Sequence, residues 1–467
     1  MPDRDLPGRP NLEQYKKQAK DLVKNFGHGN PQALARTRRH DPRLDKLRES
    51  DIQSASFART DAQPVIANAV NSTPKSRIGS IDLIRGAVMI LMAIDHVRVY
   101  SGVPPGGPTP GVFFTRWITH FCAPVFIFLA GTSIFLYGRK RADLSRYLLL
   151  RGAWLIFLEL TFLRVAWTFN FDFLHYEMAG VIWVIGCCMI LMAGLVKLPL
   201  SAVGVIGVVI IAAHNLMDSR MGKLLEGLDD DRLSGLWKIL YVGFSAGPIQ
   251  FGAKGPHLIV LYSLIPWIGV MAAGYAFGKI LTLAPSRRKQ LCLAIGLGAV
   301  GLFLVLRGFN LYGDPHPWHT AAQGRNSSPP MPALLAFLNT SKYPASLSFL
   351  LMTMGPIIAL IPLLEGLRGG LARRITVFGR VPFFFYVLHI PLIHTLALVV
   401  SKIRLGVVSP WLFTNHPMGN PEPPEGYVWS LPLLYLIWAI TIVLLYFACQ
   451  WFAALKARRN DWWLQYL

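Results

Sequence analysis

The chain has 467 residues, of which 53% are hydrophobic and only 15% are charged. Soluble domains carry about 25% charged residues, so this composition argues against a cytosolic enzyme, a secreted disulfide scaffold and a disordered tail protein. The 46 Lys and Arg residues exceed the 25 Asp and Glu residues and give a formal net charge of +21. In a soluble protein such an excess would suggest nucleic acid. Here the basic residues gather in short stretches between apolar segments, the pattern that orients membrane proteins, so no nucleic-acid partner is expected.

The first 78 residues differ in composition from the rest of the chain. Residues 1–50 are polar and basic, and the apolar residues between Asn11 and Phe26 recur with helical spacing. Asn30-Pro31 then supplies a cap and a first-turn proline for a second short helix. We expect a short, soluble helical segment that is either solvated or docks on a partner or a membrane surface. Residues 51–78 have no periodicity and are predicted to be a linker.

Residues 79–467 are predicted to form an all-α, polytopic membrane helix bundle. A helix needs roughly 20 apolar residues to cross a bilayer core, and ten segments of about this length follow the linker. No strands are expected. The ten predicted spans are 81–100, 113–137, 147–168, 178–196, 198–217, 258–281, 291–309, 344–366, 382–402 and 431–454.

The distribution of Lys and Arg predicts how these spans are oriented. Short cytoplasmic loops are rich in basic residues, whereas the connections 101–112 and 169–177 contain none and are expected outside. With about ten transmembrane helices, both the amino and the carboxyl terminus lie in the cytoplasm. The predicted location is the cytoplasmic (inner) membrane, crossed many times. The basic stretches placed inside are the first 78 residues, 139–141, 287–289, 373–374 and 456–459.

Cysteines and metal-ligand types give no strong site. All five cysteines fall within apolar segments and are expected to be small buried hydrophobes rather than disulfides. The stretch from Asp314 to His319 contains an Asp and two His residues, but it is a proline-rich outer loop without further ligands at tetrahedral spacing. No metal is expected.

Ionisable residues inside membrane spans are expensive and therefore mark candidate sites. Arg85 and His96 in the first span are eleven residues apart. Eleven helical steps return to within roughly 20° of the start, so both lie on one face, about 16 Å apart along the axis. Asp95 precedes His96 at the outer end. Two simpler interpretations stay open: a solvated helix end for Asp95-His96, and an interfacial anchor for Arg85.

The second span places two further groups at the depth of His96. Arg116 and His120 are one turn apart, so they are expected on one helix face. Two imidazoles and the carboxylate of Asp95 at one depth suit a general base with an orienting partner. A structural cluster that locks the two helices together is the alternative.

Other polar groups in the spans carry less weight. Glu159 and Arg164 on the third span are as consistent with a buried ion pair as with a site. Lys342-Tyr343 at the outer mouth of the eighth span suits an anionic or hydroxylated substrate, or an interfacial anchor. Tyr386 and His389 are three residues apart in the ninth span and share a face, and His389 is either part of a site or a satisfied core histidine.

These residues sit within motifs that resemble a known family. The set resembles the bacterial branch of the heparan-alpha-glucosaminide N-acetyltransferase catalytic-domain family, over about residues 78–467. The spacing of Arg85 and His96 is also similar to a motif of the wider transmembrane acyltransferase superfamily. The motifs are those at 80–86, 95–96, 114–131, 262–269, 342–344, 379–389 and 462–467.

The resemblance implies a transmembrane acetyltransferase. An acetyl group would pass from cytoplasmic acetyl-CoA to an amine or hydroxyl of a sugar or glycan on the far side. A neutral imidazole would act as general base or carry the acetyl group transiently. Arg116 or Lys342 would stabilise the oxyanion or orient the acceptor. The expected partners are acetyl-CoA, the acceptor and the lipid bilayer, and a homodimer is left open.

The resemblance also implies which residues form the site. In the lysosomal enzymes the key histidine lies in the loop after the first span, but the loop 101–111 contains none here. The role therefore passes to His96 or His120, with Asp95 beside them. Donor and acceptor binding would fall to Arg85, Arg116, Lys342, Tyr343, Tyr386 and His389.

Two other functions fit the sequence. The first is a transporter or flippase for a glycan precursor or small anion, although the chain shows no internal symmetry of the kind many transporters have. The second is a scaffold that recruits a partner through the amino-terminal helices.

Overall fold

The structure is a computed structural model that describes Lys24 and residues 79–105, 109–139, 141, 143–218, 231–322, 330–367, 369–418, 421–459, 461 and 464. The expected amino-terminal helices and the linker lie outside these residues, apart from Lys24. Most of the carboxyl-terminal motif at 462–467 does so too. Residues 78–467 form one compact unit.

The unit is mostly helical, and each of the ten apolar segments contains a helix. Six helical stretches in the described part of the chain are long and apolar enough to cross a membrane, and two shorter apolar helices, α10 and α18, join them. These helices indicate a multi-pass membrane protein. The number of about ten spans and the cytoplasmic placement of both termini stay predictions. The six stretches are Pro110–Gly138, Leu200–Met217, Leu264–Thr282, Pro285–Gly308, Pro382–Leu405 and Leu431–Arg458.

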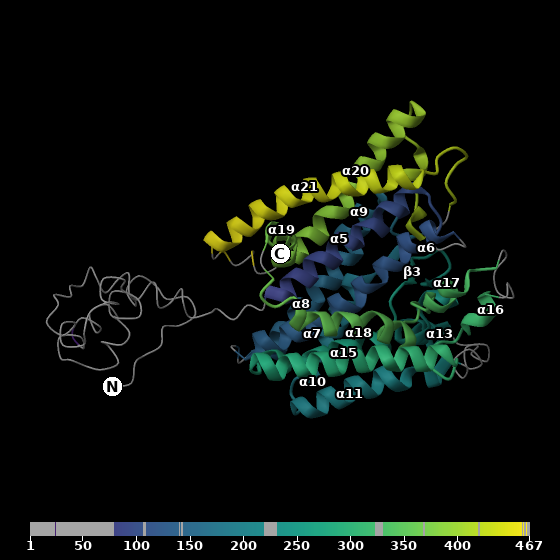
Figure 1. Ribbon diagram of the computed structural model, residues 1–467. Helices are drawn as coiled ribbons and strands as arrows, with labels where there is room; N and C mark the ends of the chain where they lie inside the picture. The colour runs from purple at the N-terminus through teal and green to yellow at the C-terminus, as the bar shows by residue number, and fades with distance from the viewer. Residues whose placement is uncertain are drawn as a thin grey trace. The chain divides into compact units, whose positions relative to one another are not determined.

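The most polar helix lies at the centre of the bundle. Helix α5 (Gly79–Ser101) packs against α19 and α20 on one side and against α7 and α18 on another, and α21 also contacts it (Figure 1). Its Asp82 and Arg98 are buried. Charged groups are costly in lipid, so a helix that carries them is stable in a membrane only when other helices surround it. The neighbours are α7 (Cys122–Gly138), α18 (Leu347–Leu363), α19 (Gly370–Arg380), α20 (Pro382–Leu405) and α21 (Leu431–Arg458).

Two of the apolar segments change their helical geometry part-way. The second consists of α6 (Pro110–Trp117), the 3-10 turn η1 (Ile118–Phe121) and α7. The third consists of α8 (Leu144–Leu158), the π-helical turn η2 (Glu159–Leu163) and α9 (Arg164–Thr168). Single π-helical turns are frequent at functional sites because they turn side chains out of the regular helical register.

Close backbone contact joins α7 to α14 (Leu264–Phe277). A Cβ atom on Gly131 would lie 2.0 Å from the carbonyl oxygen of Met271, and one on Gly274 would lie 2.1 Å from the carbonyl oxygen of Phe128. Small residues at helix interfaces let backbones approach in membranes, where packing rather than the hydrophobic effect drives association. These two glycines therefore set the distance between the two helices.

The prediction that the chain has no strands is wrong. Strand β1 (Glu177–Ala179) pairs in parallel with β3 (His257–Val260), and β2 (Ile249–Gln250) pairs antiparallel with β3. The first residues of two predicted spans, 178–196 and 258–281, are thus strands. The pairing satisfies backbone groups of two loops that run side by side just before α10 and α14. Such short strands, joined across about 80 residues of sequence, leave no periodic pattern to detect.

All five cysteines are free and four are buried as predicted, whereas Cys187 is only half-buried. Helices α11, α15 and α21 expose many apolar side chains, as helices facing lipid do. The remaining elements are α10 (Val181–Leu195), α11 (Leu200–Ala213), η3 (His214–Met217), α13 (Asp231–Trp237), η4 (Lys238–Val242), η5 (Gly243–Ala246), η6 (Ile280–Thr282), α15 (Pro285–Gly308), α16 (Trp318–Ala322), α17 (Ala333–Leu338), η7 (Pro410–Phe413) and η8 (His416–Met418).

The contact between α7 and α14 predicts the effect of adding one methyl group. Gly131→Ala should destabilise the protein by about 1–3 kcal/mol, because the helices must separate to admit the new Cβ atom. Gly298→Ala on α15 is the matched control, since a Cβ atom there meets nothing within 4 Å. Thermal unfolding in detergent should give a lower midpoint for Gly131→Ala and an unchanged or higher one for Gly298→Ala. Equal midpoints would contradict the close contact.

Candidate active site

The candidate site is a cavity of about 620 Å³ at the His96 end of α5. We call it the His96 cavity. Six of the nine residues singled out in the sequence line it, drawn from α5, α6, α20 and the turn before α18: Asp95, His96, Arg116, Lys342, Tyr343 and Tyr386. Further lining residues that the sequence analysis did not assign to a site include Arg98, Glu159, Trp167, Trp411 and His416.

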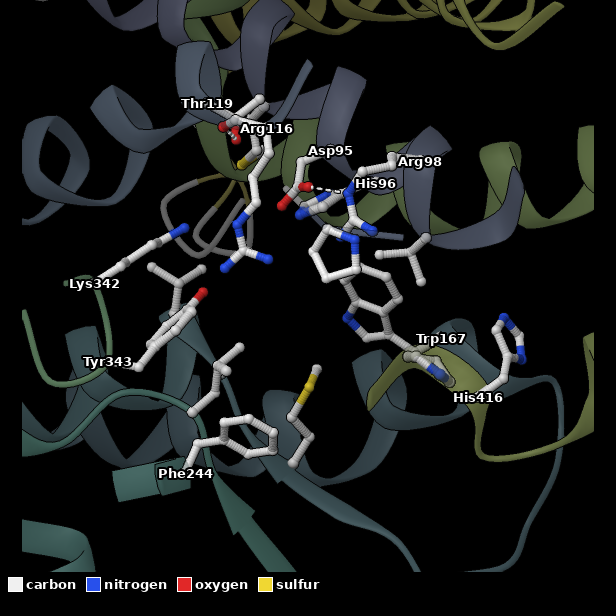
Figure 2. A pocket seen from close by; sticks show the side chains of 18 of the residues that line it. Asp95, His96, Arg98, Arg116, Thr119, Trp167, Phe244, Lys342, Tyr343 and His416 are labelled. Atoms are coloured by element: carbon white, nitrogen blue, oxygen red, sulfur yellow. Dashed lines mark hydrogen bonds and ion pairs between the residues drawn. The ribbon is translucent and has the colours of Figure 1, made fainter. Parts of the chain in front are cut away.

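Cationic and polar ends converge on the open space of this cavity. Figure 2 shows the side chains of Arg116, Lys342 and Tyr343 turned toward one another, with Asp95 on the facing wall. The ammonium nitrogen of Lys342 lies 5.2 Å from the centre of the Tyr343 ring and 6.0 Å from that of Tyr262. Cations and a phenol that face one space are the kinds of group that hold negatively charged oxygens in proteins.

Asp95 has a partner on its own helix. The Nε atom of Arg98 donates a hydrogen bond of 2.7 Å to the Asp95 carboxylate, and its guanidinium also donates to the carbonyl of Val103 at 2.9 Å. Arg98 is three residues after Asp95, a spacing that places two side chains side by side on a helix. The spacing of Asp95 and Arg98 in the sequence is therefore a signal that could have predicted this ion pair.

The ring of His96 is held by two other rings. Trp167 meets it edge-on with ring centres 4.9 Å apart, and His389 lies beside it with ring centres 4.8 Å apart and ring planes 27° apart. The Nδ1 atom of His96 lies 2.6 Å from Nε2 of His389. His389 is fully buried and lines neither of the two cavities described here. It therefore lies behind the wall residues His96 and Tyr386, both of which it contacts.

His120 lies outside the cavity wall. Its ring is 5% exposed, sits edge-on against Phe349, and neither ring nitrogen has a hydrogen-bond partner among the residues the structure describes. A continuous α-helix would place His120 on the face of Arg116, as predicted from their spacing. The 3-10 turn η1 intervenes. With three residues per turn in place of 3.6, the two side chains diverge.

Glu159 and Arg164 do not meet as an ion pair. Arg164 instead donates to the carbonyl of Tyr176 at 3.0 Å, to Asn170, and to the carbonyl of Asp172. Glu159 is 2% exposed and lines the His96 cavity. One carboxylate oxygen lies so close to Gly180 that a Cβ atom there would be 2.2 Å away, whereas the other has no hydrogen-bond partner in the described chain. The π-helical turn η2 places this carboxylate in the wall.

The loop over the cavity contributes His416, which is neutral at physiological pH. Burial, with a smaller contribution from His394, lowers the pKa of His416 to about 3. Its ring lies against Trp411, with ring centres 3.9 Å apart. The residue thus adds an uncharged aromatic surface, of the kind on which sugar rings pack, rather than a cation.

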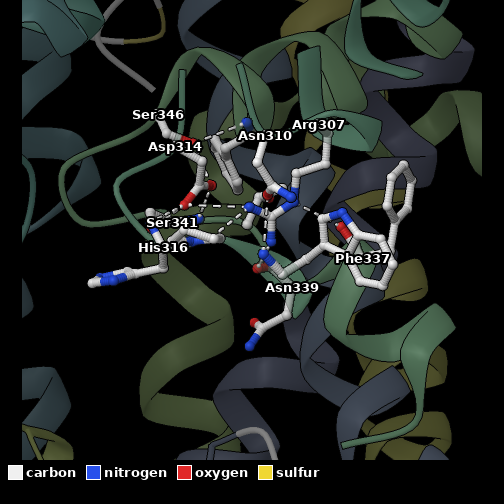
Figure 3. Close-up of polar contacts among 12 residues, drawn as sticks. Arg307, Asn310, Asp314, His316, Phe337, Asn339, Ser341 and Ser346 are labelled. Atoms are coloured by element: carbon white, nitrogen blue, oxygen red, sulfur yellow. Dashed lines mark hydrogen bonds and ion pairs between the residues drawn. The ribbon is translucent and has the colours of Figure 1, made fainter. Parts of the chain in front are cut away.

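A buried arginine fixes the loops beside Lys342 (Figure 3). Arg307, at the end of α15, donates to the carbonyl oxygens of His316, Ala336, Phe337 and Asn339 at 2.7–3.2 Å. Its guanidinium lies 3.6 Å from the carboxylate of Asp314. The arginine thereby joins the loop after α15 to the turn after α17.

Asp314 carries this connection to the cavity. Its carboxylate accepts hydrogen bonds from the backbone and side chain of Ser341, at 2.9 and 3.0 Å, and from the side chain of Ser346 at 3.1 Å. These serines flank the turn that holds Lys342 and Tyr343, which a bridge between Lys342 and Ala345 closes. Asp314 is therefore a structural residue. No group of three or more His, Cys, Asp or Glu side chains in the described chain is arranged to hold a metal.

A second cavity, of about 390 Å³, lies at the Arg85 end of α5. We call it the Arg85 cavity. Its walls are mostly apolar, with the guanidinium groups of Arg85 and Arg151 among them. Arg85 donates to Ser133 at 3.3 Å and lies 3.4 Å from Asp82. Three residues, Phe126, Val181 and Tyr386, line both cavities.

Comparison with known families gives one match. The model of the family described as heparan-alpha-glucosaminide N-acetyltransferase, catalytic, matches residues 77–311, which is just over half of the chain. The chain belongs to this family. A search of curated proteins finds no match.

Membership places the chain among acyltransferase-type enzymes. The matched stretch contains Arg85, Asp95, His96 and Arg116, on the elements that form one wall of each cavity. Lys342, Tyr386 and His389 lie beyond it. The structure brings Lys342 and Tyr386 into the wall of the His96 cavity beside Asp95, His96 and Arg116.

The Asp314 contacts predict what happens to the turn that holds Lys342 when the carboxylate is removed. Asp314→Ala should destabilise the protein by about 3–5 kcal/mol, because it removes one partner of a buried ion pair. Amide exchange at Ser341 and Ser346 should accelerate. Asp314→Asn, which keeps one acceptor oxygen, should have a smaller effect on both. Hydrogen exchange and thermal unfolding measure these changes, and unchanged exchange at 341–346 in Asp314→Ala would count against the assignment.

Proposed function

We propose that this protein transfers an acetyl group from cytoplasmic acetyl-CoA, across the inner membrane, to an amine or hydroxyl of a sugar or glycan on the outer face. One observation carries the proposal beyond family membership. The two cavities lie at opposite ends of α5 and share the wall residues Phe126, Val181 and Tyr386. A donor in one cavity and an acceptor in the other would thus meet at these three side chains.

The Arg85 cavity suits the donor. It lies at the end of α5 that the distribution of basic residues assigns to the cytoplasm. Its apolar walls fit the narrow pantetheine arm of coenzyme A, and Arg85 and Arg151 supply cations for the phosphates. The thioester at the tip of the arm would then reach the residues shared with the His96 cavity.

The His96 cavity suits the acceptor and the chemistry. His96 would take the proton from the acceptor amine or hydroxyl as that atom attacks the thioester carbonyl. The new bond to carbon forms, the carbon–sulfur bond breaks, and the departing CoA thiolate takes the proton from His96. A route through acetyl-His96 would use the same ring and the same cavity.

Three side chains would support this step. Arg116 and Lys342 point into the open space and would stabilise the negative oxygen of the tetrahedral intermediate. Tyr386 lines both cavities and would contact the thioester. The ion pair between Asp95 and Arg98 holds the carboxylate in place beside His96.

The proposal predicts different effects at the two cavities. In proteoliposomes supplied with acetyl-CoA and a panel of amino sugars and neutral sugars, His96→Ala should lower the release of free CoA by about 10²–10⁴-fold while acetyl-CoA still binds. Ala130→Phe, in the wall of the Arg85 cavity, should weaken acetyl-CoA binding in calorimetry because the larger ring fills the cavity. Ala294→Phe on the exposed face of α15 is the matched control and should change neither.

Two outcomes would contradict this function. Absence of acetyl-CoA binding to the wild-type protein would remove the acyltransferase mechanism. Uptake of a sugar or anion into proteoliposomes without acetyl-CoA would instead support a transporter.

A further inference from the structure

We infer that His389 is a positioning residue that fixes the proton of His96 on Nδ1 and so leaves Nε2 of His96 free to accept a proton in the cavity. The arrangement of protons stands on the structure alone. Its consequence for catalysis rests on the function proposed above.

The first step is the proton on His389. Its Nδ1 atom lies 2.6 Å from the carbonyl oxygen of Tyr386 and 3.2 Å from that of Phe385. A carbonyl oxygen only accepts hydrogen bonds, so Nδ1 of His389 must carry a hydrogen. A neutral imidazole has a single N–H, and its other nitrogen is an acceptor. The ring is fully buried, where an unpaired charged imidazolium is costly, so the neutral form is favoured.

The second step concerns the proton on His96, whose position follows from the one on His389. The acceptor nitrogen of His389, Nε2, lies 2.6 Å from Nδ1 of His96. Two lone pairs would repel at that distance, so Nδ1 of His96 must donate. The same rule of one N–H per neutral ring then leaves Nε2 of His96 with a lone pair. Because His96 lines the cavity and His389 does not, a substrate in the cavity would meet the ring that carries this lone pair.

The rings are also held in orientation. His389 stacks on Phe385 with ring centres 5.2 Å apart, and its hydrogen bond to His96 keeps the two imidazole planes within 27° of each other. Trp167 packs against His96 in a T-shaped arrangement and restricts the rotation of its ring. A base that is held in place by packed rings and hydrogen bonds loses little entropy when the reaction occurs.

The physical role matches that of the third member of a catalytic triad. Such a group orients the base and selects its tautomer, and loss of the correct tautomer can lower the rate by about 10⁴-fold. In most triads the orienting group is a carboxylate. Here it is a neutral ring anchored on backbone carbonyls of α20, which selects the tautomer without adding a buried charge.

Three substitutions separate positioning from packing. His389→Gln keeps a neutral acceptor oxygen near the place of Nε2, His389→Leu keeps similar volume without an acceptor, and His389→Ala removes both. For acetyl transfer we expect kcat to fall at least 100-fold in the Leu and Ala variants with KM for acetyl-CoA nearly unchanged. The Gln variant should recover kcat to within about tenfold of wild type. A Leu variant as active as the Gln variant would overturn the proposal, because packing alone would then suffice.

A measurement without turnover tests the protons directly. Histidine-labelled full-length protein in nanodiscs gives ¹⁵N resonances that distinguish protonated Nδ1 from protonated Nε2, and the signals of His96 are those lost in His96→Gln. We expect protonated Nδ1 on His96 in the wild type and a mixture of tautomers in His389→Leu. Protonated Nε2 on His96 in the wild type would overturn the inference. Protonated Nδ1 in a protein that transfers no acetyl group would uphold the proton arrangement and reject the proposed function.

Discussion

The cost of placing charged groups inside a membrane governs this fold. Helix α5 carries Asp82, Arg85, Asp95, His96 and Arg98 within 23 residues, and a helix of that composition is stable in lipid only when other helices cover it. The bundle therefore surrounds α5, while α11, α15 and α21 present apolar side chains outward. The polar side chains of α5 have partners on α5 itself and on other helices, and several of them line the two cavities. The site is thus a consequence of the way this helix is buried.

The same constraint explains why much of the site is held by backbone carbonyls. Arg164 and Arg307 are buried and donate mainly to carbonyl oxygens of the adjoining loops, and His389 anchors on α20 in the same way. Each interaction satisfies a buried donor and fixes a loop or ring beside the His96 cavity. Irregular backbone at this depth is stable only where protein groups complete its hydrogen bonds. Stability and site geometry therefore rest on the same contacts.

The features that the sequence predicts well are those that depend on residues close together in the chain. Hydrophobic runs predict the ten helical segments, because the length of an apolar run is a property of neighbouring residues. Helical geometry also separates Arg85 from His96, which line different cavities at opposite ends of α5. The family resemblance follows from motifs spread over residues 80–467, and the family match over residues 77–311 confirms it.

The features that the sequence did not reveal depend on distant contacts or on small changes of helix type. His96 and His389 are 293 residues apart in sequence, and nothing local signals their contact. The 3-10 turn before α7 moves His120 away from Arg116, and the π-helical turn places Glu159 in the cavity wall. Asp314 lies in a stretch with the residue types of metal ligands. Its partners are instead serines from a loop about 30 residues later in the sequence.

The wall common to both cavities has an electrical consequence. If the cavities fill with water and substrate, most of the transmembrane voltage falls across the layer that contains Phe126, Val181 and Tyr386. Moving one elementary charge through 100 mV changes its energy by about 2.3 kcal/mol. An acetyl group is neutral and would cross that layer without electrical work, whereas a proton would not. Under the function proposed above, such a partition would let an uncharged group pass between two compartments while their ion gradients stay separate.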